Sequence, residues 1–244
     1  MTNKMSIVSD VGSDTLLTRL ETHWQSYENK SFDVEIAGES FIVHPAVYNP
    51  DAPITRTMAH AVEVPAGARV LDLGCGVGLL GLLALRRGAA SCVFADLNPA
   101  AVQNTIANVA QFGVGDRATV VLSDLFSAVG ETPFDVILLN APFLYAATDV
   151  NKLTLGEESG LFRPGVPPAT SFFDPGYKLI ARFFATVREH LAPGGFIQFA
   201  FSNLGNRQAL DEILTQQRFR MEHVRTENTG SFEWQVYRVR PDVT

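Results

Sequence analysis

The order of apolar and polar positions along the chain changes near residue 50, and it predicts two parts of unequal size. Apolar residues recur at helical spacing in "SDTLLTRLETHWQSY", which begins at Ser13, and they predict an amphipathic helix. Two short apolar stretches flank Gly38 in "FDVEIAGESFIV" and predict a β-hairpin. We therefore expect residues 1–50 to form a small extension made of one helix and one hairpin.

After residue 50, strand-like and helix-like segments alternate along the chain. In "NPAAVQNTIANVAQFG", Asn98 predicts a helix cap, Pro99 the first helical position and Gly113 the end of the helix. The strand-like segments are "ARVLDL", "SCVFAD", "ATVVLSD", "FDVILLN" and "FIQFAF", and an antiparallel hairpin is expected around "ENTGS". This alternation predicts an α/β fold in residues 51–244, with a doubly wound, mostly parallel sheet and helices on both faces.

Composition and charge narrow the choice of partner and compartment. The formal net charge is -7 and the pI is about 5.2, which disfavours a broad nucleic-acid surface. Cys75 and Cys92 lack the spacing of a zinc site or a disulfide framework, so we expect two buried thiols and no metal. The opening residues have no apolar leader, and no apolar run is long enough to span a membrane. We expect a cytoplasmic protein.

A glycine-rich turn follows the first strand of this part, in "VLDLGCGVGLLG". Gly74, Gly76 and Gly78 permit positive φ angles and the close approach of a ligand to the backbone around Cys75. Gly76, Gly78 and Gly81 also satisfy the G-x-G-x-x-G pattern of dinucleotide-binding sites. The turn therefore indicates a nucleotide-like cofactor, with a ligand-free tight turn as the alternative.

Asp96 ends the second strand, about twenty residues after the glycines. A carboxylate at this place can accept hydrogen bonds from both hydroxyls of an adenosine ribose, which NAD and S-adenosylmethionine share. Leu97 follows it at the same edge. The alternative is that Asp96 only caps the next helix, but Asn98 can already fill that role.

Two further carboxylates favour S-adenosylmethionine over NAD. Asp72 lies two residues before the first glycine, where it can hold the amino group of a methionine moiety and would repel a pyrophosphate. Asp124 ends the third strand and can accept a hydrogen bond from the adenine amino group, while Leu125 and Phe126 cover the ring. The alternative for Asp124 is an ordinary turn residue at a strand end.

The stretch "NAPF" ends the fourth strand of this part, and it predicts the place of the chemistry. The amide oxygen of Asn140 and the carbonyl of Ala141 can accept hydrogen bonds from a planar NH or NH2 group. Pro142 fixes the turn, and Phe143 offers a ring face on which a flat group can lie. The alternative is a strand-terminating turn with a core phenylalanine.

Taken in order, "VLDLGCGVG", "ADLNPAAV", "SDLF" and "NAPF" resemble the class I S-adenosylmethionine-dependent methyltransferases. The resemblance is strongest to the family with an (N/D)-P-P-(Y/F) motif, which includes HemK-like glutamine methyltransferases, RsmC-like ribosomal RNA methyltransferases and amino-group DNA methyltransferases. It implies a Rossmann-like, seven-stranded sheet. Ala141 replaces the first proline of the motif, and the N-terminal extension is shorter than the docking domain of HemK enzymes.

The resemblance and the residues together give the expected contacts. We expect the cofactor S-adenosyl-L-methionine to contact Asp72, Gly74, Cys75, Gly76, Gly78, Asp96, Leu97, Asp124, Leu125 and Asn140. We expect the acceptor to be held for catalysis by Asn140, Ala141, Pro142 and Phe143. The segment 148–173 is too long for an ordinary connection and is interpreted as a substrate lid that carries Phe162 and Phe172, with a surface loop as the alternative. Tyr48 is a further candidate for the acceptor site.

Together, these expectations predict an N-methyltransferase that acts on a planar nitrogen of a small molecule, amino-acid derivative or peptide. The nearer alternatives are methylation of an exocyclic base amine in RNA or DNA, or of a protein glutamine. A non-catalytic cofactor-binding module is the alternative from another class, and a nicotinamide dehydrogenase is a third. The low count of basic residues in the expected lid favours a small acceptor over a long nucleic acid.

Overall fold

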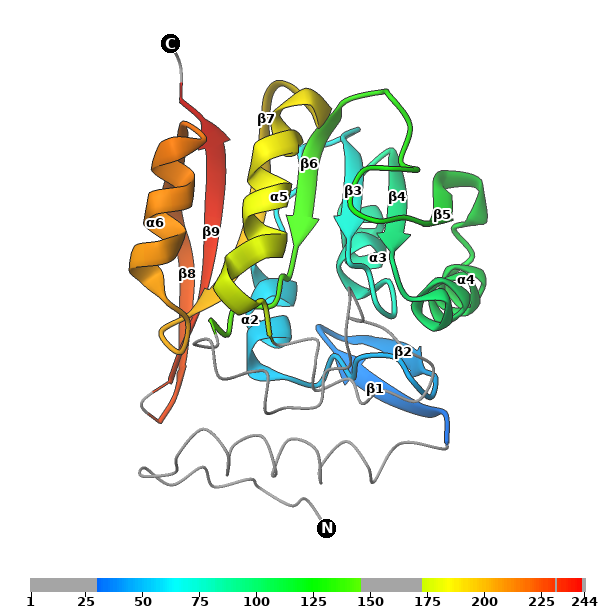
Figure 1. Cartoon of the computed structure of the whole chain (residues 1–244). Helices are drawn as coiled ribbons and strands as arrows, with labels where there is room; N and C mark the ends of the chain where they lie inside the picture. The colour runs from blue at the N-terminus through cyan, green and yellow to red at the C-terminus, as the bar shows by residue number, and fades with distance from the viewer. Residues whose placement is uncertain (1–29, 146–172, 231, 243–244) are drawn as a thin grey trace.

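The computed structural model of the chain describes residues 30–145, 173–230 and 232–242 (Figure 1). The expected helix that begins at Ser13 lies outside these residues. So does nearly all of the expected lid, including Phe162 and Phe172. Within the described ranges, no helix is long and apolar enough to cross a membrane.

A seven-stranded sheet with the order β5-β4-β3-β6-β7-β9-β8 forms the centre of the molecule. Its strands are β3 (Arg69–Leu73), β4 (Ser91–Asp96), β5 (Ala118–Leu122), β6 (Phe134–Leu139), β7 (Leu191–Ser202), β8 (Phe219–Thr229) and β9 (Phe232–Pro241). The first five strands in the sheet order are parallel, and the last two pair antiparallel. The predicted doubly wound α/β class with a terminal antiparallel hairpin is confirmed.

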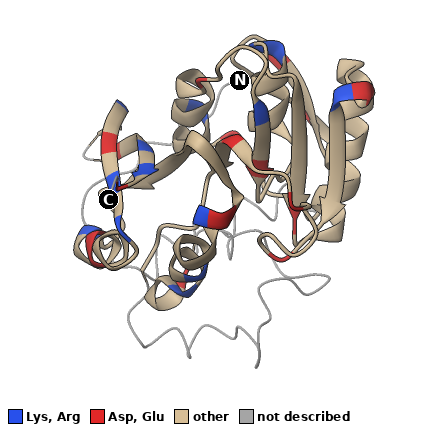
Figure 2. Cartoon of the chain, turned by 90° about the horizontal axis from the view of Figure 1, so that it is seen from above, with Lys and Arg blue, Asp and Glu red and all other residues tan. Residues whose placement is uncertain are grey.

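Helices cover both faces of this sheet. They are α2 (Pro53–Ala61), α3 (Leu79–Arg86), α4 (Pro99–Phe112), α5 (Lys178–Thr186) and α6 (Arg207–Gln216), with short 3-10 turns at Gly115–Arg117, Pro175–Tyr177 and Val187–His190. In Figure 1, α5 and α6 lie in front of the sheet, and α2 and α3 lie behind it. Figure 2 shows the layers from above, with acidic and basic residues intermingled on the outer elements.

Local sequence signals set the ends of α4 as expected. The side chain of Asn98 caps the helix by accepting a hydrogen bond from the N-H of Ala100, and Pro99 begins the helix. Gly113 ends it in the left-handed conformation, with a φ of 65°. The free thiols of Cys75 and Cys92 are both buried, as predicted.

The N-terminal hairpin joins β1 (Phe32–Ile36) to β2 (Glu39–Val43) through Ala37 and Gly38, which have φ angles of 53° and 81°. Two central residues with positive φ give the turn whose twist matches paired strands. Helix α4 then holds the outer edge of β2 with three side-chain amides, and we call this set the amide ladder. It consists of Asn104, Asn108 and Gln111, which bond to the backbone of Ser40, Ile42 and His44.

The amide ladder also reaches the glycine-rich turn. Asn108 Nδ2 donates to the carbonyl of Val77 at 2.8 Å as well as to the carbonyl of Ile42 at 2.9 Å. Asn104 and Asn108 are completely buried, so these hydrogen bonds form out of contact with water. The hairpin is therefore fixed to the same helix and turn that shape the expected cofactor site.

Strand β7 begins earlier than the apolar segment "FIQFAF" predicts. Leu191 already pairs with Phe134 of β6, and the register shifts before Phe196 pairs with Val136. Gly194 has a φ of 80° within this irregular stretch, which is where the "APGG" turn was expected. The strand accommodates the turn as a bulge, which a pattern of apolar residues does not reveal.

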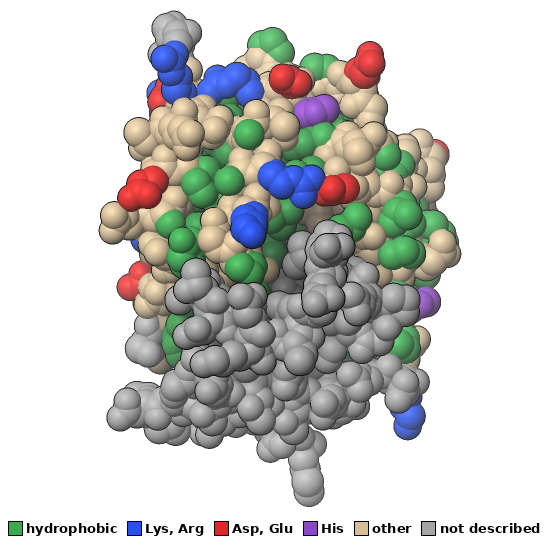
Figure 3. Space-filling view, viewed as in Figure 1, with side chains coloured by type: hydrophobic (Ala, Val, Ile, Leu, Met, Phe, Trp, Pro, Cys, Tyr) green, Lys and Arg blue, Asp and Glu red, His purple; other side chains and the backbone are tan. Residues whose placement is uncertain are grey.

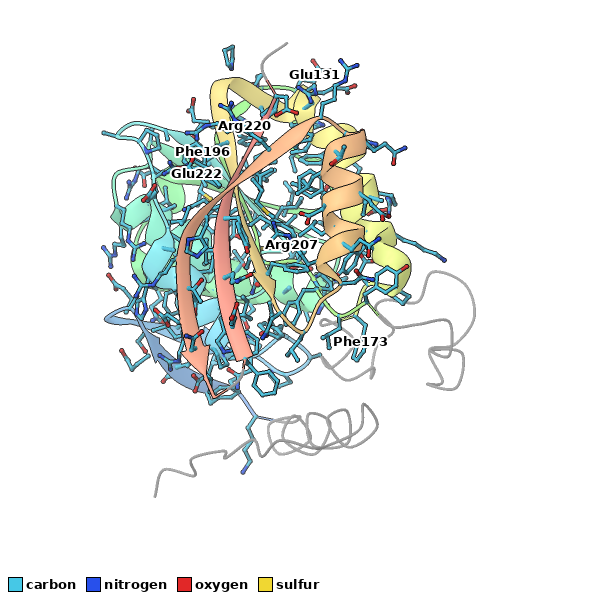
Figure 4. The ribbon with its side chains drawn as sticks, turned by 90° about the vertical axis from the view of Figure 1, so that its left-hand side faces the viewer. Glu131, Phe173, Phe196, Arg207, Arg220 and Glu222 are labelled. Carbon is cyan, nitrogen blue, oxygen red and sulfur yellow. The ribbon has the colours of Figure 1, made fainter. Side chains whose placement is uncertain are left out.

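Charged side chains on the outer strands pair with one another around Phe196, near the upper end of the sheet in Figure 4. The guanidinium groups of Arg238 and Arg240 lie 5.0 and 5.2 Å from the centre of the Phe196 ring. The carboxylate of Glu222 forms ion pairs with both arginines, and Glu63 forms a further ion pair with Arg238. Phe173 lies at the opposite, lower edge of the molecule, where the candidate site is found (Figure 4).

Candidate active site

The carboxyl ends of the parallel strands bring most of the predicted residues to one edge of the sheet. Leu73 of β3 pairs with Ala95 of β4 on one side and with Leu139 of β6 on the other. The next residue of each strand is therefore level with its neighbours, and these residues are Gly74, Asp96 and Asn140. The ligands of doubly wound sheets bind at this edge. The first and fourth strands of this part, β3 and β6, are thus direct neighbours.

The glycine-rich turn follows the end of β3 and borders open space. Gly74, Gly76 and Gly78 have φ angles of 68°, 57° and 80°, which other residues rarely adopt. A Cβ added at Gly74 or Gly76 would meet no atom within 4 Å, so the backbone of this turn borders open space. Gly74 is exposed and Gly76 half-buried, although their neighbours Leu73, Cys75 and Val77 are buried. A cofactor can thus approach the backbone at these two positions.

Gly78 and Gly81 allow close packing, and contact of Gly78 with the cofactor stays a prediction. A Cβ at Gly81 would lie 2.3 Å from the Phe94 ring and 2.7 Å from the Cys92 sulfur. At Gly78, the added atom would lie 3.0 Å from Thr105. The third glycine of the G-x-G-x-x-G pattern therefore allows α3 to pack closely against β4.

Asp72 supports the first turn of α3. It is 1% exposed, and its Oδ2 accepts a 2.8 Å hydrogen bond from the N-H of Gly81. Burial raises the pKa of Asp72 to about 7, and the nearby carboxylate of Asp96 adds to this rise. One carboxylate oxygen is thus used by the protein itself. Contact of Asp72 with a methionine amino group stays a prediction.

Asp96 ties the ends of two neighbouring loops together. Its Oδ2 accepts a 2.9 Å hydrogen bond from Gly76 N-H, and its Oδ1 accepts a 2.8 Å bond from Asn98 N-H. Burial raises the pKa of Asp96, and the backbone hydrogen bonds oppose that rise. The carboxylate is held rigidly beside the glycine-rich turn, in the position from which it is predicted to bind a ribose. Exposed Leu97 follows it.

Asp124 is placed beyond the end of β5, at the same edge, and it is exposed. Its Oδ2 pairs with Arg182 of α5 at 2.8 Å, a partner that the sequence did not indicate. Leu125 has a φ of 50°, and the half-buried ring of Phe126 stacks on His190 with the centres 4.2 Å apart. The side of the molecule that carries α5 is shown in Figure 3, where basic and acidic side chains lie among apolar ones.

The amide of Asn140 is bound to helix α2. Its Nδ2 donates a 3.1 Å hydrogen bond to Oγ1 of Thr55, which is 4% exposed. The hydroxyl of Tyr48 lies 3.5 Å from the same Oγ1, so this predicted acceptor residue is brought next to Asn140. Thr55 itself was not predicted, because no spacing or motif in "PITRTMAHA" distinguishes it from its neighbours.

The residues after Asn140 are held tightly. Ala141 and Phe143 are buried and Pro142 is half-buried. The Phe143 ring is 3% exposed and meets the edge of Trp234 at a centre distance of 6.3 Å. The ring therefore belongs to the packed wall of the site in this structure, and its contact with an acceptor stays a prediction. Among the described residues, no group of His, Cys, Asp or Glu gathers as a metal site requires.

Comparisons with known proteins agree with this geometry. Residues 40–155 match the family model of the methyltransferase small domain. A Methanocaldococcus jannaschii protein with the provisional name protein N5-glutamine methyltransferase is 28% identical over 74% of this chain and 85% of its own length. The release factor glutamine methyltransferase of Cereibacter sphaeroides is 37% identical over 59% of this chain and 50% of its own length.

Ribosomal RNA methyltransferases are also similar to this chain. Ribosomal RNA small subunit methyltransferase C of Hamiltonella defensa is 31% identical over 51% of this chain and 35% of its own length. The chain thus matches half or less of the two bacterial relatives. The T. thermophilus 16S rRNA methyltransferase RsmC, solved with AdoMet and guanosine, has the same fold, with a TM-score of 0.58 at 20% identity over 87% of this chain and 50% of that one.

The sheet order, the glycine-rich turn and these relatives define a class I S-adenosylmethionine-dependent methyltransferase. Within that class, the chain matches the methyltransferase small domain over residues 40–155 and is similar to the HemK-like glutamine methyltransferases. Its cofactor is S-adenosyl-L-methionine, which the open backbone at Gly74 and Gly76 fits. The predicted class of enzyme and the predicted cofactor are confirmed.

The relatives correct one prediction. A small-molecule or peptide acceptor was expected and nucleic acid was considered unlikely, whereas the similar proteins are named for a release factor, ribosomal protein L11 and ribosomal RNA. The expectation failed because a net charge of -7 is a sum over the whole chain. Such a sum says nothing about the surface beside the site.

Proposed function

We propose that this methyltransferase transfers a methyl group to the side-chain amide nitrogen of a glutamine in a protein. The observation that carries the proposal is the amide of Asn140, which is fixed at the edge of the sheet through its nitrogen. The two relatives named as glutamine methyltransferases support this acceptor. One of them is matched over 85% of its own length.

The cofactor would be held along the carboxyl ends of β3, β4 and β5. The backbone of Gly74 and Gly76 borders the methionine part, Asp96 accepts from the ribose hydroxyls, and Asp124 accepts from the adenine amino group. When bound, S-adenosylmethionine supplies a methyl group on a positively charged sulfur, and it leaves as S-adenosylhomocysteine once the methyl carbon is bonded to an acceptor nitrogen that loses a proton.

The residues of this chain contribute by alignment. A primary amide has two N-H donors in one plane, and the Oδ1 of Asn140 with the carbonyl of Ala141 can accept one each. These acceptors fix the nitrogen and stabilise the positive charge that develops on it. Tyr48 and Pro142 border the place of the acceptor. No strong base is required, because the proton leaves toward acceptors that are already in place.

A second candidate is the exocyclic amino group of a base in ribosomal RNA. It presents the same planar pair of donors, so the same two acceptors serve it. The relative named for ribosomal RNA supports this candidate, at 31% identity over about half of this chain. Either acceptor class fits a cytoplasmic location, since protein synthesis takes place there.

We further propose the division into an extension at 1–50 and a methyltransferase domain at 51–244, with a substrate lid at 148–173. The lid would contribute Phe162 and Phe172 to the acceptor site. The family match that begins at residue 40 and the amide ladder both indicate that the hairpin works together with the domain.

The test is to identify the methylated product. The full chain is incubated with methyl-labelled S-adenosylmethionine and a cell extract from a strain that lacks it, and aliquots are then treated with protease or nuclease. Label that is released by protease and recovered as N5-methylglutamine after digestion supports the proposal. Label recovered as a methylated nucleoside supports the second candidate instead.

The Asn140→Ala variant is the matched control in this assay. It should bind S-adenosylhomocysteine like the wild type but incorporate little label. Wild-type protein that binds the cofactor product yet labels neither fraction would refute both candidates.

A further inference from the structure

The amide of Asn140 has two orientations of almost the same shape but opposite chemistry. With Oδ1 toward the acceptor, it offers a lone pair to an N-H group. After a half-turn about its last bond, it offers two N-H donors, which repel another donor. A methyltransferase of this kind needs a device that selects the first orientation.

The structure contains such a device on helix α2. Thr55 Oγ1 lies 3.1 Å from Nδ2 of Asn140, so the hydroxyl oxygen accepts one amide proton. Among the described residues, no donor bonds to Oδ1 of Asn140. The amide nitrogen is thus tied to the protein, while the amide oxygen is left for the acceptor.

Thr55 is itself held firmly. It lies in the first turn of α2, after Pro53, and is 4% exposed. A β-branched side chain in a helix has few rotamers, so the position of its hydroxyl is well defined. The helix packs against β7, β8 and β9 of the sheet, and β7 is the neighbour of β6, which leads to Asn140.

Tyr48 completes the arrangement. Its hydroxyl lies 3.5 Å from Thr55 Oγ1, at the outer limit of a hydrogen bond, and can take the hydroxyl proton of Thr55. Thr55 then acts as an acceptor toward Asn140 rather than as a donor. Burial raises the pKa of Tyr48 to about 12, so this phenol stays neutral at physiological pH.

We propose that Thr55 is a positioning residue, whose buried hydroxyl turns the amide oxygen of Asn140 toward the acceptor nitrogen. This inference rests on the proposed role of Asn140 and extends it to a residue that touches neither cofactor nor acceptor. It holds for either acceptor class, because both present a planar nitrogen with N-H donors.

The test compares Thr55→Val, which lacks the hydroxyl, with Thr55→Ser, which keeps it. Thr57→Val is the matched control, since Thr57 is a buried threonine of the same helix whose hydroxyl bonds to Pro53 and Glu227 instead. Binding of S-adenosylhomocysteine should be within about twofold of the wild type in all three variants. Should Thr55→Val be poorly folded, Thr55→Ala takes its place.

The first readout does not depend on the acceptor. Protein labelled with nitrogen-15 in asparagine and saturated with S-adenosylhomocysteine gives a side-chain amide signal for Asn140, assigned by its loss in Asn140→Ala. Exchange of its protons with solvent should accelerate at least about tenfold in Thr55→Val, because the hydrogen bond that protects one of them is lost. Thr55→Ser and Thr57→Val should exchange like the wild type. Equal exchange in Thr55→Val would overturn the proposal.

The second readout is the rate of label incorporation from S-adenosylmethionine into a cell extract. Thr55→Val should lower this rate at least about tenfold, and Thr55→Ser should restore it. In the Asn140→Ala background, Thr55→Val should have no further effect. Full activity of Asn140→Ala would refute the proposed function, whereas loss in Asn140→Ala with full activity in Thr55→Val would refute only the role of Thr55.

Discussion

The hydroxyl of Tyr177 donates a 2.7 Å hydrogen bond to the carbonyl oxygen of Phe143 and accepts a 2.8 Å hydrogen bond from the N-H of Asn206. Tyr177 is fully buried, and burial raises its pKa to about 12. One phenol therefore joins the segment that follows Asn140 to the loop before α6. The backbone of the candidate site is held at this point from the side opposite α2.

Tyr177→Phe should destabilise the protein and loosen the "NAPF" segment. The change removes the hydrogen bonds to the Phe143 carbonyl and from the Asn206 N-H, and each lost bond costs about 0.5 to 1.5 kcal/mol. Urea unfolding should show the loss of stability, and label incorporation should fall with it. Tyr237→Phe is the matched control, because its hydroxyl donates to Gln235 of the same strand and accepts from Arg207 of α6, so the loss of these bonds should leave label incorporation unchanged. A variant Tyr177→Phe as stable as the wild type would contradict the expectation.

Asp96→Asn should weaken cofactor binding at least tenfold. A charge-assisted hydrogen bond contributes about 1.5 to 3 kcal/mol, and the amide loses one acceptor while gaining donors toward Gly76. Calorimetric titration with S-adenosylhomocysteine measures the effect. Asp116→Asn, on the exposed turn after α4, should bind like the wild type. Equal affinity of both variants would remove Asp96 from the cofactor site.

Asn140→Ala should lower turnover by about 100-fold while cofactor affinity changes little, because the amide acts on the acceptor nitrogen during transfer. Initial rates of label incorporation and calorimetry with S-adenosylhomocysteine measure the two effects separately. Near-normal turnover would show that "NAPF" is only a turn that ends the strand and that it has no catalytic role.

The stability of Asp72→Asn relative to the wild type should rise with pH. The pKa of Asp72 is about 7 in the folded protein and about 4 in an unfolded chain, so the folded state holds the proton more tightly. Between pH 4 and 7 the wild type therefore loses stability, because the carboxyl ionises in the unfolded chain while the buried group keeps its proton, whereas the amide ionises in neither state. Melting temperatures at pH 5 and pH 8 give the comparison. A difference between the two proteins that is constant with pH would contradict the raised pKa.

Arg182→Gln should leave stability within about 1 kcal/mol of the wild type, since its pair with Asp124 is solvent-exposed. Its effect should appear in cofactor binding, because Asp124 is then free to accept from the adenine amino group. We expect S-adenosylhomocysteine to bind a few-fold more tightly at low salt, with the gain shrinking at high salt as the ion pair of the wild type is screened. Weaker binding would mean that Arg182 itself contacts the cofactor.

The sequence predicted those features that local rules determine. The cap at Asn98 and the end at Gly113 follow from the backbone needs of a helix terminus. The meeting of Asp96 and Asn140 at one edge follows from the way parallel strands are arranged. The first feature depends on residues that are close in the chain, and the second on the alternation of strands and helices, which the sequence pattern shows.

Partners from distant segments were not predicted. Thr55 and Arg182 bond to Asn140 and Asp124 across 85 and 58 residues of chain. Only the packing of α2 and α5 on the sheet brings them there, and neither residue type indicates such a role by itself. The early start of β7 was not predicted either. Its first residue, Leu191, belongs to the strand because it pairs with Phe134 of β6, a distant segment.

The amide ladder has a consequence for how copies of this chain meet in concentrated solution. A two-stranded sheet has bare backbone groups at its edges, to which strands of another molecule can add. Asn104, Asn108 and Gln111 occupy the donors and acceptors along the outer edge of β2 with side chains of their own helix. That edge is therefore closed to intermolecular β-pairing, so the hairpin resists aggregation there without needing a further strand.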